Sequence, residues 1–321
     1  MVLVDTIGFD NSDQSDTDAL QDISMWLAES YVKKIHLAKV LYLHDITNHR
    51  LSRSRRMNLL MLKRLVGETS LSDVIFLTNR WESVDRRTGE NILSKLTSSV
   101  DMWGAMIQRG SVVERFSGTA QDAHRILGSI LKNKRRVVLD IQKELIDQHL
   151  DLSETAAGKV VLEEIRILQL RYMDQIKTLP QAMGNALKAK NFKAYEAMAR
   201  RREHLEDSMK QQQDNIFKFK SQNSKLEELR LMQKEESRRI EDRLSHLEKE
   251  SAAPPPPYTE SEVQRVISDQ ANSGGVVSAA ALKRPDYVRN VLIILWEFCQ
   301  KLLRPQLRAG YERLEWRCVR Y

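Results

Sequence analysis

The chain has 321 residues, of which 41% are hydrophobic and 30% charged, and it carries a formal net charge of +7. Its two cysteines, Cys299 and Cys318, are too few for a disulfide framework, which favours a reducing, cytoplasmic compartment. The most apolar stretch, residues 291–303, is too short for the roughly 20 apolar residues of a spanning helix, so we expect no membrane span. Basic and aromatic residues are not interleaved as in base-stacking surfaces, and we expect no nucleic-acid partner.

The first 135 residues alternate between short apolar runs and amphipathic segments. The expected order is a strand at 2–4, a helix at 19–34, a strand at 40–44, a helix through 59–65, a strand at 74–78, a helix at 91–106, a weaker strand at 111–116 and a helix at 122–131. Strands that alternate with helices predict an α/β fold with a parallel sheet and flanking helices. Ligands of such sheets bind beyond the carboxyl ends of the strands, so functional residues are expected there.

Strand signals end near residue 136, and a long helical region is expected over 136–250. From 205 to 247 a seam can be followed in alternating steps of four and three, which is the period of a coiled coil, although polar residues interrupt its middle. This seam is either a surface for self-association or partner helices, or one side of a helical hairpin folded back on the first domain. A Pro-rich and disordered linker is expected at 251–285, and a short helix with a basic tail at 286–321.

The motif Asp5-Thr6-Ile7-Gly8 follows the first apolar strand. A carboxylate at a strand end suits Mg²⁺, usually held through water, and a glycine lets its backbone N–H approach the γ-phosphate of a nucleotide. Asp5 and Gly8 are therefore candidate nucleotide-binding residues, and Asp5 is also the candidate magnesium ligand. The motif is common by chance, and the buried strand before it strengthens the hypothesis.

The motif Asn79-Arg80-Trp81-Glu82 follows the third strand, where guanine-binding proteins place Asn-Lys-x-Asp. An acid there takes the guanine N1–H and N2–H₂ while a long basic stem covers the ring. Arg80 can stack over a base, whereas Glu82 is one methylene longer than aspartate. Ser117-Gly118-Thr119 can offer backbone N–H groups to the base carbonyl, although Ser-Gly is also a common turn. The candidate guanine-binding residues are Asn79, Arg80, Glu82, Ser117 and Gly118.

These motifs resemble those of a known group. Residues 2–10, then Tyr42-Leu43-His44-Asp45-Ile46-Thr47, then Leu77-Thr78-Asn79-Arg80-Trp81, are similar to segments of fungal P-loop GTPase-like proteins, which are related to the septin and avirulence-induced (immunity-associated) GTPases. The resemblance covers roughly residues 1–160. It implies a partial G domain of the P-loop NTPase fold at 1–135, with guanine nucleotide and Mg²⁺ as ligands. Ile7 stands where the family usually has proline, and Glu82 replaces the usual acid.

The family's phosphate loop, Gly-x-x-x-x-Gly-Lys-Ser/Thr, does not occur in the 321 residues. That loop supplies the backbone cradle and the lysine for the β- and γ-phosphates, and the first switch threonine is absent with it. Because the chain starts on a buried strand, we expect the loop to lie upstream of Met1; the other interpretation is a truncated pseudo-GTPase. GTP hydrolysis is expected only if the loop exists, and the chain as given should bind GTP very weakly or not at all.

Two functions from different classes follow from these patterns. In the first, the chain is a guanine-nucleotide-binding protein whose nucleotide state controls the helical region. In the second, it is a non-catalytic interaction or scaffold protein, in which a degenerate nucleotide fold carries a coiled coil.

Overall fold

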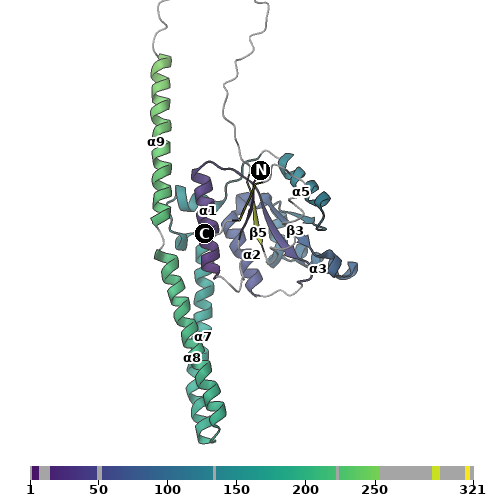
Figure 1. Ribbon diagram of the computed structural model, residues 1–321, viewed down its shortest axis with the longest axis vertical. Helices are drawn as coiled ribbons and strands as arrows, with labels where there is room; N and C mark the ends of the chain where they lie inside the picture. The colour runs from purple at the N-terminus through teal and green to yellow at the C-terminus, as the bar shows by residue number, and fades with distance from the viewer. Residues whose placement is uncertain are drawn as a thin grey trace, which may run out of the picture. The chain divides into compact units, whose positions relative to one another are not determined.

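The computed structural model describes residues 2–6, 15–48, 53–132, 135–221, 224–252, 291–296 and 315–318. They belong to two compact units, Met1–Arg230 with Arg289–Tyr321, and Leu231–Val288. The first unit contains an α/β body and a helical hairpin, which can be followed in Figure 1. The described part of the second unit is residues 231–252, which form the C-terminal portion of one helix.

A parallel sheet forms the centre of the first unit. Its strands are β1 (Val2–Asp5), β2 (Leu37–Asp45), β3 (Val74–Asn79), β4 (Val112–Arg115), β5 (Val291–Trp296) and β6 (Glu315–Cys318). They lie in the order β4-β3-β2-β5-β1-β6, and each neighbouring pair is parallel. The expectation of an α/β fold with a parallel sheet is therefore confirmed.

Strand β5 differs from the prediction for the end of the chain. We expect a helix within 286–321, whereas residues 291–296 form a strand that pairs with β1 on one side and β2 on the other. A short apolar run has no periodicity that separates a buried strand from a buried helix. The helix prediction is wrong here. Residues 291–296 become a strand because they pair with β1 and β2, and a local sequence pattern does not reveal this pairing.

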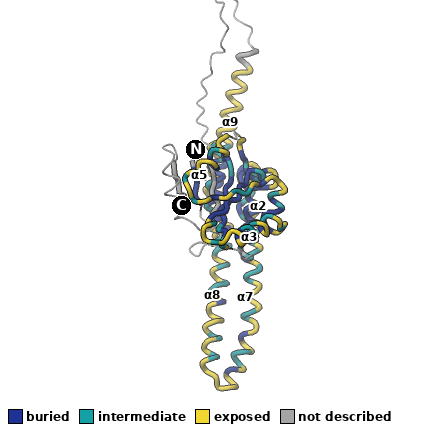
Figure 2. The backbone as a smooth tube through the Cα atoms, turned by 90° about the vertical axis from the view of Figure 1, so that its right-hand side faces the viewer, coloured by how far each residue is buried: buried dark blue, intermediate teal, exposed yellow. Residues whose placement is uncertain are grey.

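The helices around the sheet come from the segments between the strands. They are α1 (Asp16–Val32), α2 (Arg53–Val66), α3 (Arg86–Ser98), α4 (Ala105–Gln108), α5 (Ala120–Lys132) and α6 (Asp140–Gln142), with the short turns η1 (Glu68–Asp73), η2 (Trp81–Ser83), η3 (Val100–Gly104), η4 (Lys143–Asp147) and η5 (Leu152–Glu154). Figure 2 shows that the sheet they surround is largely buried.

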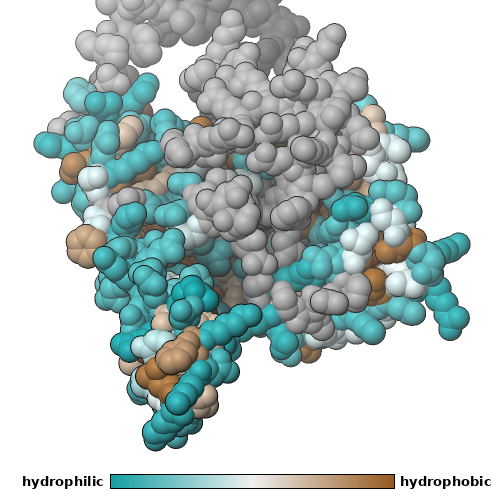
Figure 3. All heavy atoms as spheres, turned by 60° about the horizontal axis from the view of Figure 1, so that its bottom comes forward, coloured by the Kyte–Doolittle hydropathy of each residue, from teal (hydrophilic) through white to brown (hydrophobic). Residues whose placement is uncertain are grey.

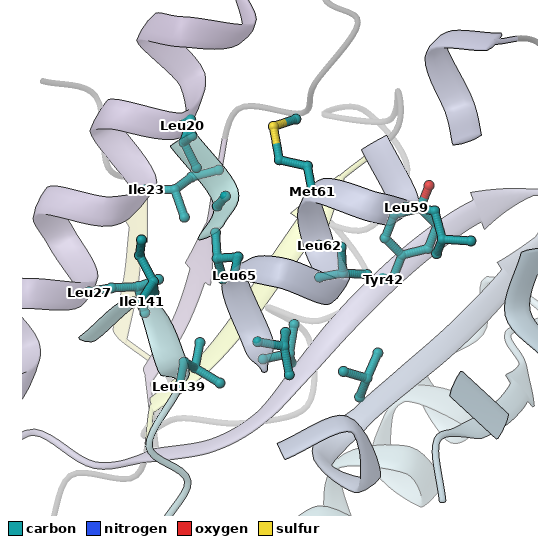
Figure 4. Packing of buried hydrophobic residues seen from close by; sticks show 14 of the residues in the cluster. Leu20, Ile23, Leu27, Tyr42, Leu59, Met61, Leu62, Leu65, Leu139 and Ile141 are labelled. Carbon is teal, nitrogen blue, oxygen red and sulfur yellow. The ribbon is translucent and has the colours of Figure 1, made fainter. Parts of the chain in front are cut away.

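Alternate residues of the central strands face two separate cores. In β2, Val40 and Tyr42 belong to one core and Leu41 and Leu43 to the other. Successive side chains of a strand point to opposite faces, so this alternation shows a strand covered on both sides. Helices α1 and α2 fill the first core, as Figure 4 shows, and α5 fills the second.

Three long helices, α7 (Ala156–Lys188), α8 (Phe192–Ser221) and α9 (Ser224–Ala252), follow the sheet segments. Helices α7 and α8 lie side by side as a hairpin that contacts α1 and α2 (Figures 1 and 2). The seam residues of α8 are buried or half-buried; they are Leu205, Met209, Gln212, Ile216 and Phe219. For this stretch, the packing agrees with the hairpin interpretation.

Part of the predicted organisation falls on residues outside the described part of the chain. Residues 253–290, which hold most of the linker expected at 251–285, lie outside the described residues, and so does Gly8. The first unit includes residues 136–230, which we expected to form a separate helical region with 231–250. No helix in the part of the chain that the structure describes is long and apolar enough to cross a membrane.

Two glycines of α7 give opposite expectations for alanine substitution. A Cβ on Gly158 would lie 1.9 Å from the Leu152 carbonyl oxygen, whereas a Cβ on Gly184 would meet nothing within 4 Å. We expect Gly158→Ala to lower the free energy of unfolding by about 1–3 kcal/mol through this overlap. Gly184→Ala should raise it by up to about 1 kcal/mol, because alanine is the better helix former. Urea unfolding followed by circular dichroism measures both, and similar effects at the two sites would contradict this packing.

Candidate functional site

The carboxyl ends of the strands form a stepped edge. Asp45, the last residue of β2, pairs in register with Asn79, the last residue of β3. Asp5, the last residue of β1, is in register with Ile294 of β5. Ile294 is in register with Leu41 of β2, and Leu41 with Ile75 of β3, so Asp5 lies at the level of Ile75. Asp5 therefore ends its strand well before the level that Asp45 and Asn79 reach.

The step separates the two halves of the predicted site. Asn79 lies four positions beyond Ile75, which is about 13 Å along the strand, and β1 lies three strand spacings from β3, about 14 Å across the sheet. A ligand that contacts both Asp5 and Asn79 must therefore be elongated. The prediction that these residues share one edge of one sheet agrees with the topology, but they are not immediate neighbours.

Asn79 carries an unusual buried group. The residue is 7% exposed, and its side-chain Oδ1 has no hydrogen-bond partner among the described residues. Its backbone carbonyl accepts a hydrogen bond from the Ile46 N–H at 3.2 Å, which ties β3 to the end of β2. A buried acceptor left unpaired costs about 1–3 kcal/mol. Such groups in a folded protein call for an explanation, and a bound ligand is one of them.

Asp45 organises the loop beside Asn79. Its Oδ1 accepts hydrogen bonds from the Thr47 N–H at 2.9 Å and the Thr47 hydroxyl at 2.6 Å. Its Oδ2 lies 3.1 Å from Nη1 of Arg80. Arg80 has the left-handed backbone conformation, with φ of 60°, which costs a non-glycine residue about 1–2 kcal/mol. The guanidinium that we expected to cover a base is thus held beside the end of β2.

Trp81 is fixed by three contacts. Its indole N–H donates to the Thr78 hydroxyl at 3.0 Å, and the Arg115 guanidinium lies over its ring at 4.0 Å. On the side of α3, Gly89 leaves room for the ring, because a Cβ there would lie 2.7 Å from it. The next residue, Glu82, is exposed and makes no hydrogen bond or ion pair within the described residues. Its carboxylate is therefore available to a ligand.

The turn after β4 offers one of its two expected backbone donors. The N–H of Ser117 donates to Oδ2 of Asp122 at 2.9 Å, so it is already used. Hydrogen bonds from Ser117, and then from Arg125, hold the pKa of the Asp122 carboxyl below its usual range. Gly118 has a φ of 80°, and its N–H donates to no described residue. The Gly118 N–H therefore remains available at this end of the edge.

Sequence patterns did not single out Asp45 and Asp122, although both shape the site. Asp45 carried a signal, because an aspartate side chain commonly accepts a hydrogen bond from the backbone N–H two residues later and so forms a turn. Asp122 carried a weaker one, since its N–H donates to the Thr119 hydroxyl as at a helix start. Neither pattern shows that the Asp45 carboxylate pairs with Arg80 or that the Asp122 carboxylate accepts from the Ser117 N–H.

The described residues fit a magnesium nucleotide only in part. No group of three or more His, Cys, Asp or Glu residues within them could hold a metal ion. Mg²⁺ at nucleotide sites is held by one or two carboxylates together with phosphates, so Asp5 would act only with a bound nucleotide. The base side fits better, because the Glu82 carboxylate and the Gly118 N–H have no described partner and Asn79 keeps a buried, unpaired acceptor.

Comparisons with models of protein families, with curated proteins and with solved structures find no match to this chain. The resemblance to fungal GTPase-like proteins therefore stays a prediction from motifs.

Asp45 gives a test of this edge. Asp45→Asn keeps an acceptor for Thr47 and removes the ion pair with Arg80, so we expect it to lower the free energy of unfolding by at most about 1 kcal/mol. Asp45→Ala removes the carboxylate that accepts from the Thr47 N–H and hydroxyl and should cost about 1–3 kcal/mol. Urea unfolding of both variants measures the difference. Equal losses would show that the hydrogen bonds to Thr47 do not hold the loop.

Proposed function

We propose that the edge formed by β2, β3 and β4 binds guanine nucleotides and that binding there is coupled to the helical region. The observation that carries the proposal is the buried, unpaired Oδ1 of Asn79 at the carboxyl end of a central parallel strand. Ligands of open α/β sheets bind at this end of the strands. A ligand that donates to Asn79, directly or through an ordered loop, would satisfy this group.

The other groups at the edge suit the base. The Glu82 carboxylate can accept from the guanine N1–H and N2–H₂, and the Gly118 N–H can donate to the O6 acceptor. Adenine carries a donor where guanine has O6, so it would place that donor opposite the Gly118 N–H. This arrangement favours guanine over adenine.

The phosphate side contributes less. Asp5 would hold Mg²⁺ through water, but the 321 residues contain no Gly-x-x-x-x-Gly-Lys-Ser/Thr loop to surround the phosphates. Binding energy should therefore come mainly from the base, and added phosphates should strengthen binding little. We propose weak binding of the nucleotide, and a hydrolytic step is not part of the proposal.

Nucleoside selectivity tests this proposal. We expect guanosine to bind at least about tenfold more tightly than adenosine, because a good bidentate contact to a base edge contributes about 1–3 kcal/mol of discrimination. Asn79→Leu should remove guanosine binding. Saturation-transfer NMR with each nucleoside measures the affinities. Asn91→Leu is the matched control, because Asn91 is an exposed asparagine on α3.

Two results would contradict the proposal. Equal affinity for guanosine and adenosine would exclude a guanine site at this edge. Micromolar or tighter binding of a fluorescent GTP analogue with Mg²⁺ would show that the phosphates are held strongly without the loop, and the base-centred account would be wrong.

We propose a non-catalytic interaction function as the second candidate. It rests on the second unit, where Ile240, Leu244 and Leu247 continue the four-three seam and are 42%, 54% and 53% exposed. Exposed apolar residues at this spacing along a helix favour a helical partner, which would bury the seam. In this function the chain self-associates or binds partner helices through the end of α9.

Light scattering of the purified chain tests this second candidate. We expect an oligomer that dissociates on dilution, and a monomer when Leu244→Ser and Leu247→Ser are combined. Leu231→Ser with Met232→Ser is the matched control, because both residues are exposed on α9 but lie off the seam. A chain that is monomeric at every concentration, or a control that dissociates equally, would rule out self-association through this seam.

A further inference from the structure

The tip of the α7–α8 hairpin is a tight, hydrogen-bonded turn. The N–H of Asn191 donates to the Ala186 carbonyl at 2.9 Å and the N–H of Lys190 to the Leu187 carbonyl at 3.0 Å. Lys190 has a φ of 54°, so the pair of bonds closes α7 in the usual way for a left-handed residue after a helix. The Asn191 side chain then accepts from the Ala194 N–H at 3.1 Å and caps α8. The side chains of the tip are therefore presented from an ordered backbone.

Large apolar side chains are exposed at this tip. Phe192, the first residue of α8, is 63% exposed, and Leu187, in the last turn of α7, is 45% exposed. Figure 3 shows apolar side chains gathered at the end of the hairpin that is turned toward the viewer, with hydrophilic ones around them. An aromatic and an aliphatic side chain that are both exposed at the end of a hairpin indicate a surface that contacts something apolar.

The charge around these side chains has one sign. Lys188, Lys190 and Lys193 are exposed, and none of them forms an ion pair within the described residues. Between Asp174 and Glu196 the sequence has no acidic residue. Basic residues elsewhere on the hairpin do pair with acids, for example Arg202 with Glu206. The tip is therefore a local excess of positive charge and not part of the balanced charge pattern of the helices.

We propose that the tip of the α7–α8 hairpin binds the surface of an anionic lipid bilayer. In this arrangement Lys188, Lys190 and Lys193 contact the headgroups, and Phe192 and Leu187 enter the boundary between headgroups and acyl chains. Lysines attract anionic lipid, and large apolar side chains beside them strengthen interfacial binding. A soluble polyanion would use the lysines but leave both apolar side chains in water, so the bilayer accounts for more of the surface.

The charge part of the proposal is tested with the full chain and sucrose-loaded vesicles. One set is phosphatidylcholine alone, and the other contains about 30 mol% phosphatidylserine, a lipid of the anionic leaflets that attract polybasic segments. The wild-type chain should sediment with the anionic vesicles and not with the neutral ones. Combining Lys188→Gln, Lys190→Gln and Lys193→Gln should weaken partition about 100-fold, because each lysine near the surface contributes about fivefold.

A matched control separates the tip from net charge. Lys210→Gln, Lys218→Gln and Lys220→Gln remove the same charge from exposed positions on α8. Lys210 is about 25 Å from Lys193 along α8, which is beyond the Debye length of about 8–10 Å at physiological salt. This control should change partition by less than about threefold. Circular dichroism checks that the helices form in each variant.

The apolar part has its own pair of variants. Phe192→Ser should weaken vesicle binding about tenfold, because the ring would no longer be buried in the interface. Phe217→Ser should have no effect, since Phe217 is 73% exposed on α8 but lies away from the tip.

Three outcomes would overturn the proposal. The first is equal binding to neutral and anionic vesicles, or none to either. The second is an equal loss for the two triple lysine variants, which would assign binding to net charge. The third is binding to heparin that depends on the tip lysines while Phe192→Ser leaves vesicle binding unchanged, which would make the tip a site for soluble polyanions.

Discussion

Strands β2 and β3 are covered on both faces, and the rest of the first unit follows from this burial. Tyr42 and Phe76 face the core under α1 and α2, whereas Leu41 and Ile75 face the core under α5. A parallel sheet with no open face can expose its strands only at their ends. Polar side chains therefore collect at the carboxyl edge, which is where the ligands of such sheets bind.

That edge combines groups that are satisfied with groups that are not. Asp45 holds Thr47 and Arg80, and Asp122 holds Ser117, so the loops around the site are fixed by hydrogen bonds. Asn79 remains with a buried acceptor that has no partner in the described part of the chain. Natural proteins often keep such costs where function needs them. The contrast between these fixed loops and the unpaired Asn79 acceptor is the physical basis for proposing a ligand at this edge.

The four-three seam of the helical region is buried in one part and exposed in another. Along α8 the seam residues are buried or half-buried, and Ile216 and Phe219 pack in the core that contains α1, so this part of the seam contributes to intramolecular packing. In the second unit the same spacing continues through Ile240, Leu244 and Leu247, which remain exposed. The hairpin tip adds a third kind of surface, with lysines around Phe192. A hairpin closed by a hydrogen-bonded turn can therefore support an interaction surface at its end, separate from the edge of the sheet.

Local periodicity in the sequence determined the alternation of strands and helices, the α/β class, and the position of Asp5, Asn79 and the Ser117 turn at strand ends. These features depend on side chains a few residues apart, which a short window contains. The tertiary structure alone decided the insertion of β5 between β1 and β2, the step that separates Asp5 from Asn79, and the capture of Arg80 by Asp45. Each of these features depends on residues far apart in the chain. Their geometry is set by how the sheet and its helices pack.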